Sequence, residues 1–320
     1  MPLPGRRQTG AGPARQPAIR LARGASLGAV RRLLVALTAV CAAAAVTAAF
    51  AQVRRDDALS RRVSAAQPAQ DLPAPAVPLP RTPAGLAQAL TTTTRQLRHA
   101  VGRWDAAAAV PRDVTHLALH HQRLLRLMAA RRALGDATLG RLPHDLREEA
   151  RDTVRGRRHL AQIPRSKGRL PRVRVADAAP AAALRRHYDA AQQRFGIHWS
   201  VLASINFVES AFGRVRSASE AGARGPMQFL PSTWRRYGMG GDIDDPRDAI
   251  LAAANYLHRS GARRDLDRAL FAYNHSTAYV RAIRRFAARM RSDARSYLVY
   301  YAWRVYVRTT TGTRRLTGPR

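Results

Sequence analysis

One acidic side chain stands where the surrounding pattern predicts an apolar one. The stretch "HWSVLAS" reads as an amphipathic helix, with Leu202 and Ile205 on one face, and the next position of that face is Glu209. An ionised carboxylate is costly to bury at such a place. We therefore expect Glu209 either to pair with a cation or to lie at the edge of a cleft with a shifted pKa.

Two further stretches of the same region carry polar groups suited to sugar chemistry. They are "GARGPMQFLPSTW", residues 222–234, and "ALFAYNHS", residues 269–276. A glycosidic bond breaks when its leaving oxygen is protonated by a carboxylic acid whose pKa is raised by apolar surroundings. Glu209, one turn after Ile205, has that placement.

The order of these motifs resembles that of the soluble lytic transglycosylases. A Glu-Ser pair, a Gly-x-Met-Gln turn and an Ala-Tyr-Asn motif follow one another over roughly residues 185–305. The resemblance implies a catalytic domain similar to goose-type lysozyme. It also implies cleavage of the MurNAc–GlcNAc bond of peptidoglycan, with the muramic acid C6 hydroxyl attacking C1 to give a 1,6-anhydro end. The upstream helical region looks like that of actinobacterial members.

The same resemblance implies a role for each matching residue. Glu209 acts first as acid and then as base, and Tyr273 holds its carboxyl. The other substrate-binding positions are Ser210 near the substrate amide groups, Met227 and Gln228 along the cleft, and Asn274 against sugar. The sequence departs from the family pattern at Pro226, where a larger aliphatic residue is common, and at His275-Ser276, where Ala-Gly is common.

A one-carboxylate site is consistent with this chemistry, because hydrolysis by water usually needs a second acid. The last unit offers no other carboxylate in an apolar context: Glu220 and Asp242, Asp244, Asp245 and Asp248 lie in loops. Two alternatives stay open. One is a muramidase that uses water, and the other is a membrane- or wall-binding protein whose domain binds glycan without cleaving it. For Glu209 itself, the alternative is a structural carboxylate paired with an arginine.

Helices must position these residues, so we expect a mainly α fold. Gly and Pro punctuate the predicted helices of a catalytic domain at 181–307, and few windows alternate with period two. These helices are 181–194, 199–211, 231–237, 248–260, 265–273 and 277–290.

A smaller helical module is expected at 84–164. Its apolar stripes run through Leu86, Leu90, Leu97 and Val101 and through Val114, Leu117, His121, Leu124, Leu125 and Met128. A linker at 165–180 follows it, so we expect residues 165–320 to fold and act alone. A tail at 308–320 ends the chain.

The chain's charge indicates anionic partners. The formal net charge over 320 residues is +34, and Lys167 is the only lysine. We expect arginine-rich regions to bind anionic wall polymers or a membrane surface. No nucleic-acid motif accompanies the charge. We expect a monomer that binds peptidoglycan strands and needs no cofactor.

The N-terminal region has the pattern of an export signal. A basic segment at 1–32, expected to be disordered, precedes an apolar run at 33–51 that ends in a small-x-small motif. The run also suits an uncleaved membrane anchor, so both remain open. A Pro/Ala-rich linker at 52–83 would then lead to the folded part, outside the membrane and facing the wall.

Two motifs could suggest metals. His116 and His120 lie one helical turn apart, but no further ligand pair supports a site. The segment "GDIDDPRD", residues 241–248, lacks the glycine and terminal glutamate of a calcium loop. We interpret it as a turn and helix N-cap and expect no metal.

Overall fold

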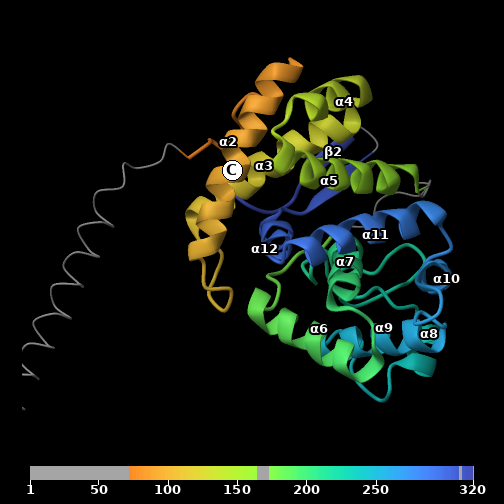
Figure 1. Cartoon of the computed structure of the whole chain (residues 1–320). Coiled ribbons are helices and arrows are strands. Elements are labelled where there is room, and N and C mark those ends of the chain that lie inside the picture. Colours follow the sequence, from red (N-terminus) through yellow and green to blue (C-terminus); the bar gives the residue numbers. More distant parts are fainter. Residues whose placement is uncertain (1–71, 164–172, 310–311, 320) are drawn as a thin grey trace, which may run out of the picture. The chain divides into compact units, whose positions relative to one another are not determined.

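The computed structural model describes residues 72–163, 173–309 and 312–319 (Figure 1). The predicted basic segment, the signal or anchor and most of the Pro/Ala-rich linker lie outside these ranges. So does the first half of the linker at 165–180. Among the described residues, no helix combines the length and the apolar character needed to cross a membrane.

Helices dominate the described residues, as predicted. The first group comprises α2 (Pro83–Arg103), α3 (Arg112–Ala130), α4 (Arg132–Arg141) and α5 (His144–Gln162). Both apolar stripes of the predicted module are buried, His121 included. Pro143 is the N-cap of α5.

The second group holds the three motifs. It comprises α6 (Ala181–Phe195), α7 (Trp199–Ser210), α8 (Pro231–Tyr237), α9 (Pro246–Arg259), α10 (Leu266–Tyr273), α11 (Thr277–Ser292) and α12 (Arg295–Ala302). Six of these agree with the predicted helices to within about two residues. The sequence analysis missed α12 and a hairpin of β1 (Tyr306–Thr309) and β2 (Gly312–Arg315), which pair in antiparallel register.

Helix α7 lies at the centre of the second group, in contact with α6, α9, α11 and α12 (Figure 1). Its residues from Trp199 to Asn206 are all buried. A helix that is apolar on every side belongs in a core, and this one therefore fixes the position of whatever its last turn carries.

The two groups share one core. Helix α5 packs along α11, and α12 contacts α2 and α3. All the described helices belong to one compact unit, Asp71–Arg320. The Phe286 ring of α11 is fully buried, and a Cβ added to Gly156 of α5 would lie 2.9 Å from it. This packing argues against the expectation that residues 165–320 act alone, because a chain without α5 would expose Phe286. The predicted domain boundaries themselves remain a prediction.

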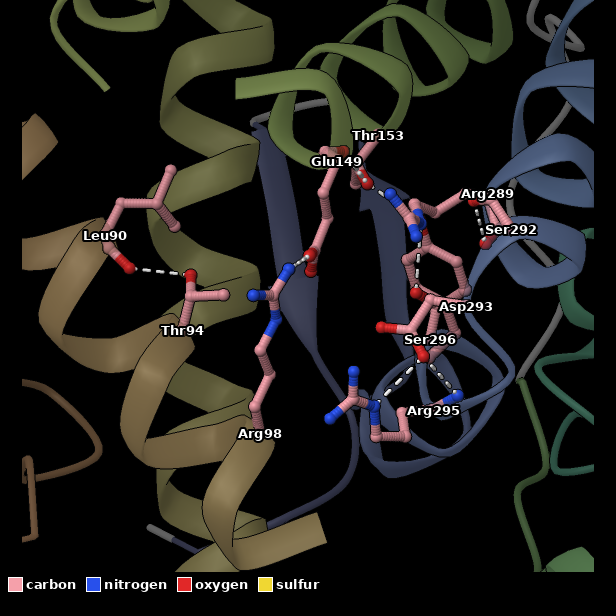
Figure 2. Close-up of polar contacts among 11 residues, drawn as sticks. Leu90, Thr94, Arg98, Glu149, Thr153, Arg289, Ser292, Asp293, Arg295 and Ser296 are labelled. Atoms are coloured by element: carbon pink, nitrogen blue, oxygen red, sulfur yellow. Dashed lines mark hydrogen bonds and ion pairs between the residues drawn. The ribbon is translucent and has the colours of Figure 1, made fainter. Parts of the chain in front are cut away.

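Buried polar contacts join the same surfaces (Figure 2). Arg98 of α2 pairs with Glu149 of α5 at 2.5 Å. One turn later, Thr153 lies 2.7 Å from the Tyr300 hydroxyl of α12. Because Thr153 already donates to the Glu149 carbonyl, Tyr300 is the donor of that bond. These groups can be buried because each has a partner.

We predict that Gly156→Val destabilises the whole unit in a single unfolding transition. The larger side chain has no room against Phe286, and overpacking costs roughly 1–3 kcal/mol. The melting temperature should fall by several degrees, as measured by circular dichroism. Gly102→Val in α2 is the matched control, since nothing lies within 4 Å of its added Cβ. Equal effects of the two changes would contradict the shared core.

Candidate functional site

Glu209 occupies the last turn of α7 and is half-buried. The helix ends one residue later, where Ala211 and Phe212 adopt left-handed φ values of 52° and 65°. Two successive non-glycine residues in this region are strained. The surrounding structure must therefore hold the helix end in place.

Ser210 supplies that hold. Its hydroxyl accepts from the Gly213 amide at 2.7 Å and donates to the Pro226 carbonyl at 2.6 Å. The side chain is 1% exposed. It thus ties the end of α7 to the Gly-Pro-Met-Gln turn, and it does not face substrate amide groups as the sequence analysis expected.

The Gly-Pro-Met-Gln turn is closed by backbone bonds between Arg224 and Phe229, at 2.8 and 2.9 Å. Gly225 is required, because its φ is 76° and an added Cβ would lie 1.9 Å from the Ile243 carbonyl oxygen. Gln228 has a left-handed φ of 50°, and its amide nitrogen donates to the Gly225 carbonyl at 3.1 Å. The Gln228 side chain is therefore held through its terminal amide while remaining partly exposed.

Tyr273 ends α10 and reaches the same turn. Its hydroxyl donates to the Met227 carbonyl at 2.6 Å. The Met227 side chain is fully buried, so it supports the turn from beneath instead of lining a cleft as expected. The Tyr273 hydroxyl thus donates to the turn and not to Glu209, although burial and the nearby Glu209 both raise the pKa of Tyr273 well above its usual range.

A different tyrosine faces the carboxyl of Glu209. Burial raises the pKa of Glu209 to about 7, and the Tyr279 hydroxyl opposes part of that rise. The contact between the two groups falls outside ordinary hydrogen-bond geometry, and the buried Tyr279 hydroxyl has no other partner among the described residues. Burial and the nearby Glu209 in turn raise the pKa of Tyr279 well above its usual range. Glu209 thus keeps its proton in about half of the molecules at pH 7, beside a neutral phenol.

Sequence reasoning missed Tyr279, although a signal for it was present. The Ser276 hydroxyl accepts from the Tyr279 amide at 3.2 Å and caps α11. Ser276 is one of the positions that depart from the family pattern. A serine that caps a helix places the residue three positions later in the first helical turn. What the sequence could not give was the direction of the ring.

The other acids of this region have structural roles or lie in solvent. Asp244 pairs with Arg224 at 2.7 Å, and Asp245 caps α9 by accepting from the Asp248 amide. The interpretation of this segment as a turn and N-cap is confirmed. Glu220 is exposed. Among the described residues, no three His, Cys, Asp or Glu side chains lie together in a way that could hold a metal ion.

The structure brings the three motifs into one place. Ser210 bonds the turn at Pro226, Tyr273 bonds it at Met227, and Tyr279 follows Tyr273 with parallel rings 6.5 Å apart. Glu209, Gln228 and Asn274 keep partly exposed side chains at this junction. The arrangement can donate a proton from Glu209 and hydrogen-bond a polar ligand.

We predict that Glu209→Gln stabilises the protein, and does so more at pH 8 than at pH 5. The folded carboxyl has a raised pKa, so it binds a proton that the unfolded chain releases between pH 4.5 and 7. Stability therefore falls as pH rises through that window, by up to roughly 3 kcal/mol, and glutamine avoids this loss. Melting temperatures at both pH values test it. The exposed Glu220→Gln is the control and should change little at either pH; an equal shift in both variants would contradict the burial of Glu209.

Comparison with known proteins identifies the region that contains this junction. Residues 187–294 match the family model described as "Transglycosylase SLT domain". A curated relative, "Membrane-bound lytic murein transglycosylase F" of Thiobacillus denitrificans, is 35% identical over 122 residues. The match covers 36% of this chain and 26% of the relative, so the chain spans about a quarter of that protein's length. No solved structure gives a significant match. The part of the chain that carries Glu209, the Gly-Pro-Met-Gln turn and Tyr273 is therefore similar to the transglycosylase SLT domain.

Proposed function

We propose that this protein is a peptidoglycan lytic transglycosylase that cleaves the MurNAc–GlcNAc β-1,4 bond. The observation that carries the proposal is a single half-buried carboxyl, Glu209, whose pKa of about 7 keeps it half protonated at neutral pH. Similarity to the SLT domain supports the substrate class. So does the name of the relative, which describes a lytic murein transglycosylase.

Protonated Glu209 donates its proton to the glycosidic oxygen as the bond from C1 of MurNAc to that oxygen breaks. The C6 hydroxyl of the same MurNAc then attacks C1, and ionised Glu209 accepts the hydroxyl proton. The products are a free GlcNAc hydroxyl and a 1,6-anhydro end, and the enzyme recovers its starting protonation state. No water is consumed, which is why one carboxyl suffices.

The remaining residues support Glu209 in this scheme. Gln228 and Asn274 keep partly exposed polar groups and are proposed to bind sugar. Ser210, Met227 and Tyr273 act by holding the turn in place. Tyr279 restrains the carboxyl and stabilises its ionised form once the proton has left.

A muramidase remains the alternative within the same chemistry. It would need a second carboxylate to activate water. Glu220 is the acid to test, because it is exposed and no ion pair or cap engages it among the described residues.

The same proposal places the protein in the cell envelope, facing the wall. The relative's name describes it as membrane-bound, and the apolar run at 33–51 suits either an export signal or an anchor. We further propose that the protein acts as a monomer and that its arginines bind anionic polymers. Its likeness to actinobacterial members remains a prediction.

We predict that Glu209→Gln abolishes release of muropeptides from purified wall while binding persists. The amide has the carboxyl's size but cannot deliver a proton, and general acid catalysis alone is worth ~10²–10⁴-fold. Mass spectrometry of the parent's products should show anhydro ends, one water lighter than reducing ends.

Glu220→Gln serves as the counterpart and should leave the rate and the products unchanged. Reducing ends together with loss of activity in Glu220→Gln would establish the muramidase instead. If Glu209→Gln released muropeptides at the parent's rate, Glu209 would not be the catalytic acid.

We predict that Tyr279→Phe changes the pH dependence of cleavage, whereas Tyr273→Phe does not. Cleavage starts from protonated Glu209, so activity falls as pH rises through about 7. The Tyr279 hydroxyl lowers the pKa of Glu209, so its removal should move this alkaline limb to higher pH. The rate should also drop by about tenfold or more as positioning is lost.

Tyr273→Phe leaves the Met227 carbonyl without its donor. That change should destabilise the protein by roughly 1–3 kcal/mol. The pH at which the cleavage rate falls should stay the same. Rate profiles and melting temperatures of both variants decide the assignment. A shifted limb in Tyr273→Phe alone would restore the role that the sequence analysis gave to Tyr273.

A further inference from the structure

A groove of about 840 Å³ lies away from Glu209, beside α11. Its walls come from the end of α5, the connection between α6 and α7, the connection between α9 and α10, and α11 itself. Helix α7 contributes Ser200 and Val201 at its first turn, whereas Glu209 lies in its last turn. Eight residues of helix separate Val201 from Glu209 by about 12 Å, so the groove is distinct from the proposed active site.

Arginines dominate the polar lining of this groove. Arg281, Arg284, Arg285 and Arg291 come from α11, and Arg263 faces them from the connection before α10. The α11 positions recur at spacings of three, four and seven residues, which places them on one side of the helix. They form a row about 15 Å long.

Few acids offset this charge. Arg284 lies 3.4 Å from Asp267, and Arg285 lies 3.1 Å from Asp152. The other three, Arg263, Arg281 and Arg291, are exposed and form no ion pair among the described residues. Unpaired like charges along one groove repel each other, and a bound anion would relieve that repulsion.

The pKa values of two histidines that line the groove are lowered in part by these arginines. Burial lowers the pKa of His159, and Arg281 and Arg285 lower it further. Burial likewise lowers the pKa of His198, with Arg291 contributing. Both shifts favour the neutral imidazole, so the positive charge of the groove lies on its arginines.

The groove's floor is apolar. Ile197, Val201, Leu266, Val280, Ile283 and Ala287 line it beneath the arginines. A rim of guanidinium groups over an aliphatic floor suits a strand in which anionic groups alternate with carbon-rich units. Planar guanidinium groups match phosphate oxygens in pairs, and a concave groove admits a strand more readily than a flat bilayer.

We propose that this groove binds a phosphate-bearing polymer of the cell wall. It would hold the protein on the wall through a surface that takes no part in bond cleavage. That the polymer belongs to the cell wall rests on the proposed function, but binding in the groove does not involve Glu209. Failure of the polymer-binding test would therefore not affect the proposed cleavage activity. Loss of the cleavage proposal would likewise not affect binding of phosphate polymers in the groove.

The test compares two triple variants of the full chain that lose the same charge. The groove variant carries Arg263→Gln, Arg281→Gln and Arg291→Gln. The control carries Arg112→Gln, Arg131→Gln and Arg132→Gln, three exposed arginines outside the groove. Short-chain polyphosphate is titrated into each by calorimetry at several salt concentrations, and melting temperatures check the fold.

The groove variant should bind polyphosphate at least ~10-fold more weakly at physiological salt, and with a shallower salt dependence, because three phosphate contacts are lost. The control should lose no more than ~2-fold. Both variants should cleave phosphate-free glycan fragments at the parent's rate.

Three outcomes would overturn the proposal. Equal losses in both variants would mean that affinity follows net charge and not the groove. Tighter groove-dependent binding of poly-glutamate would assign the site to a carboxylate polymer. Groove-dependent binding to anionic phospholipid vesicles without binding of polyphosphate would assign it to a lipid surface.

Discussion

The desolvated carboxyl of Glu209 is the constraint on which the proposed chemistry depends. A carboxyl keeps its proton near pH 7 only if no cation lies close enough to favour its ionised form. This is a demanding condition in a chain with 55 lysines and arginines and a net charge of +34. The structure meets it by surrounding Glu209 with neutral groups, foremost the buried Tyr279.

Helix α11 separates the two kinds of surroundings. Its buried face presents Tyr279 toward Glu209 and Phe286 toward α5, while Arg281, Arg284 and Arg291 stand exposed on its other side. Helical periodicity fixes these faces relative to each other. Helix α11 therefore shields Glu209 from solvent on one side and presents arginines to the groove on the other. Helix α5 covers the apolar face and thereby completes the core beneath the site.

Side-chain hydroxyl groups hold the site together by bonding to backbone carbonyls. Ser210 and Tyr273 both bond to carbonyls of one turn, and that turn contains Gln228 with a left-handed φ. Strain at Ala211, Phe212 and Gln228 persists because these bonds leave the chain no relaxed alternative. Ser210, which was expected to lie near substrate, thus serves together with Tyr273 to place Glu209 and Gln228.

The sequence by itself determined most helices of the catalytic domain, the buried stripes and the importance of Glu209, because periodicity and a misplaced carboxyl are local signals. It also predicted a turn and a helix N-cap in the segment 241–248, where Asp245 caps α9. Only the tertiary structure decided which tyrosine faces Glu209, since Tyr273 and Tyr279 are equally eligible by type and spacing. Ring direction depends on the crossing of α10, α11 and the turn at Met227. The joining of α5 to α11 was likewise invisible, because contacts between distant segments leave no period in the sequence.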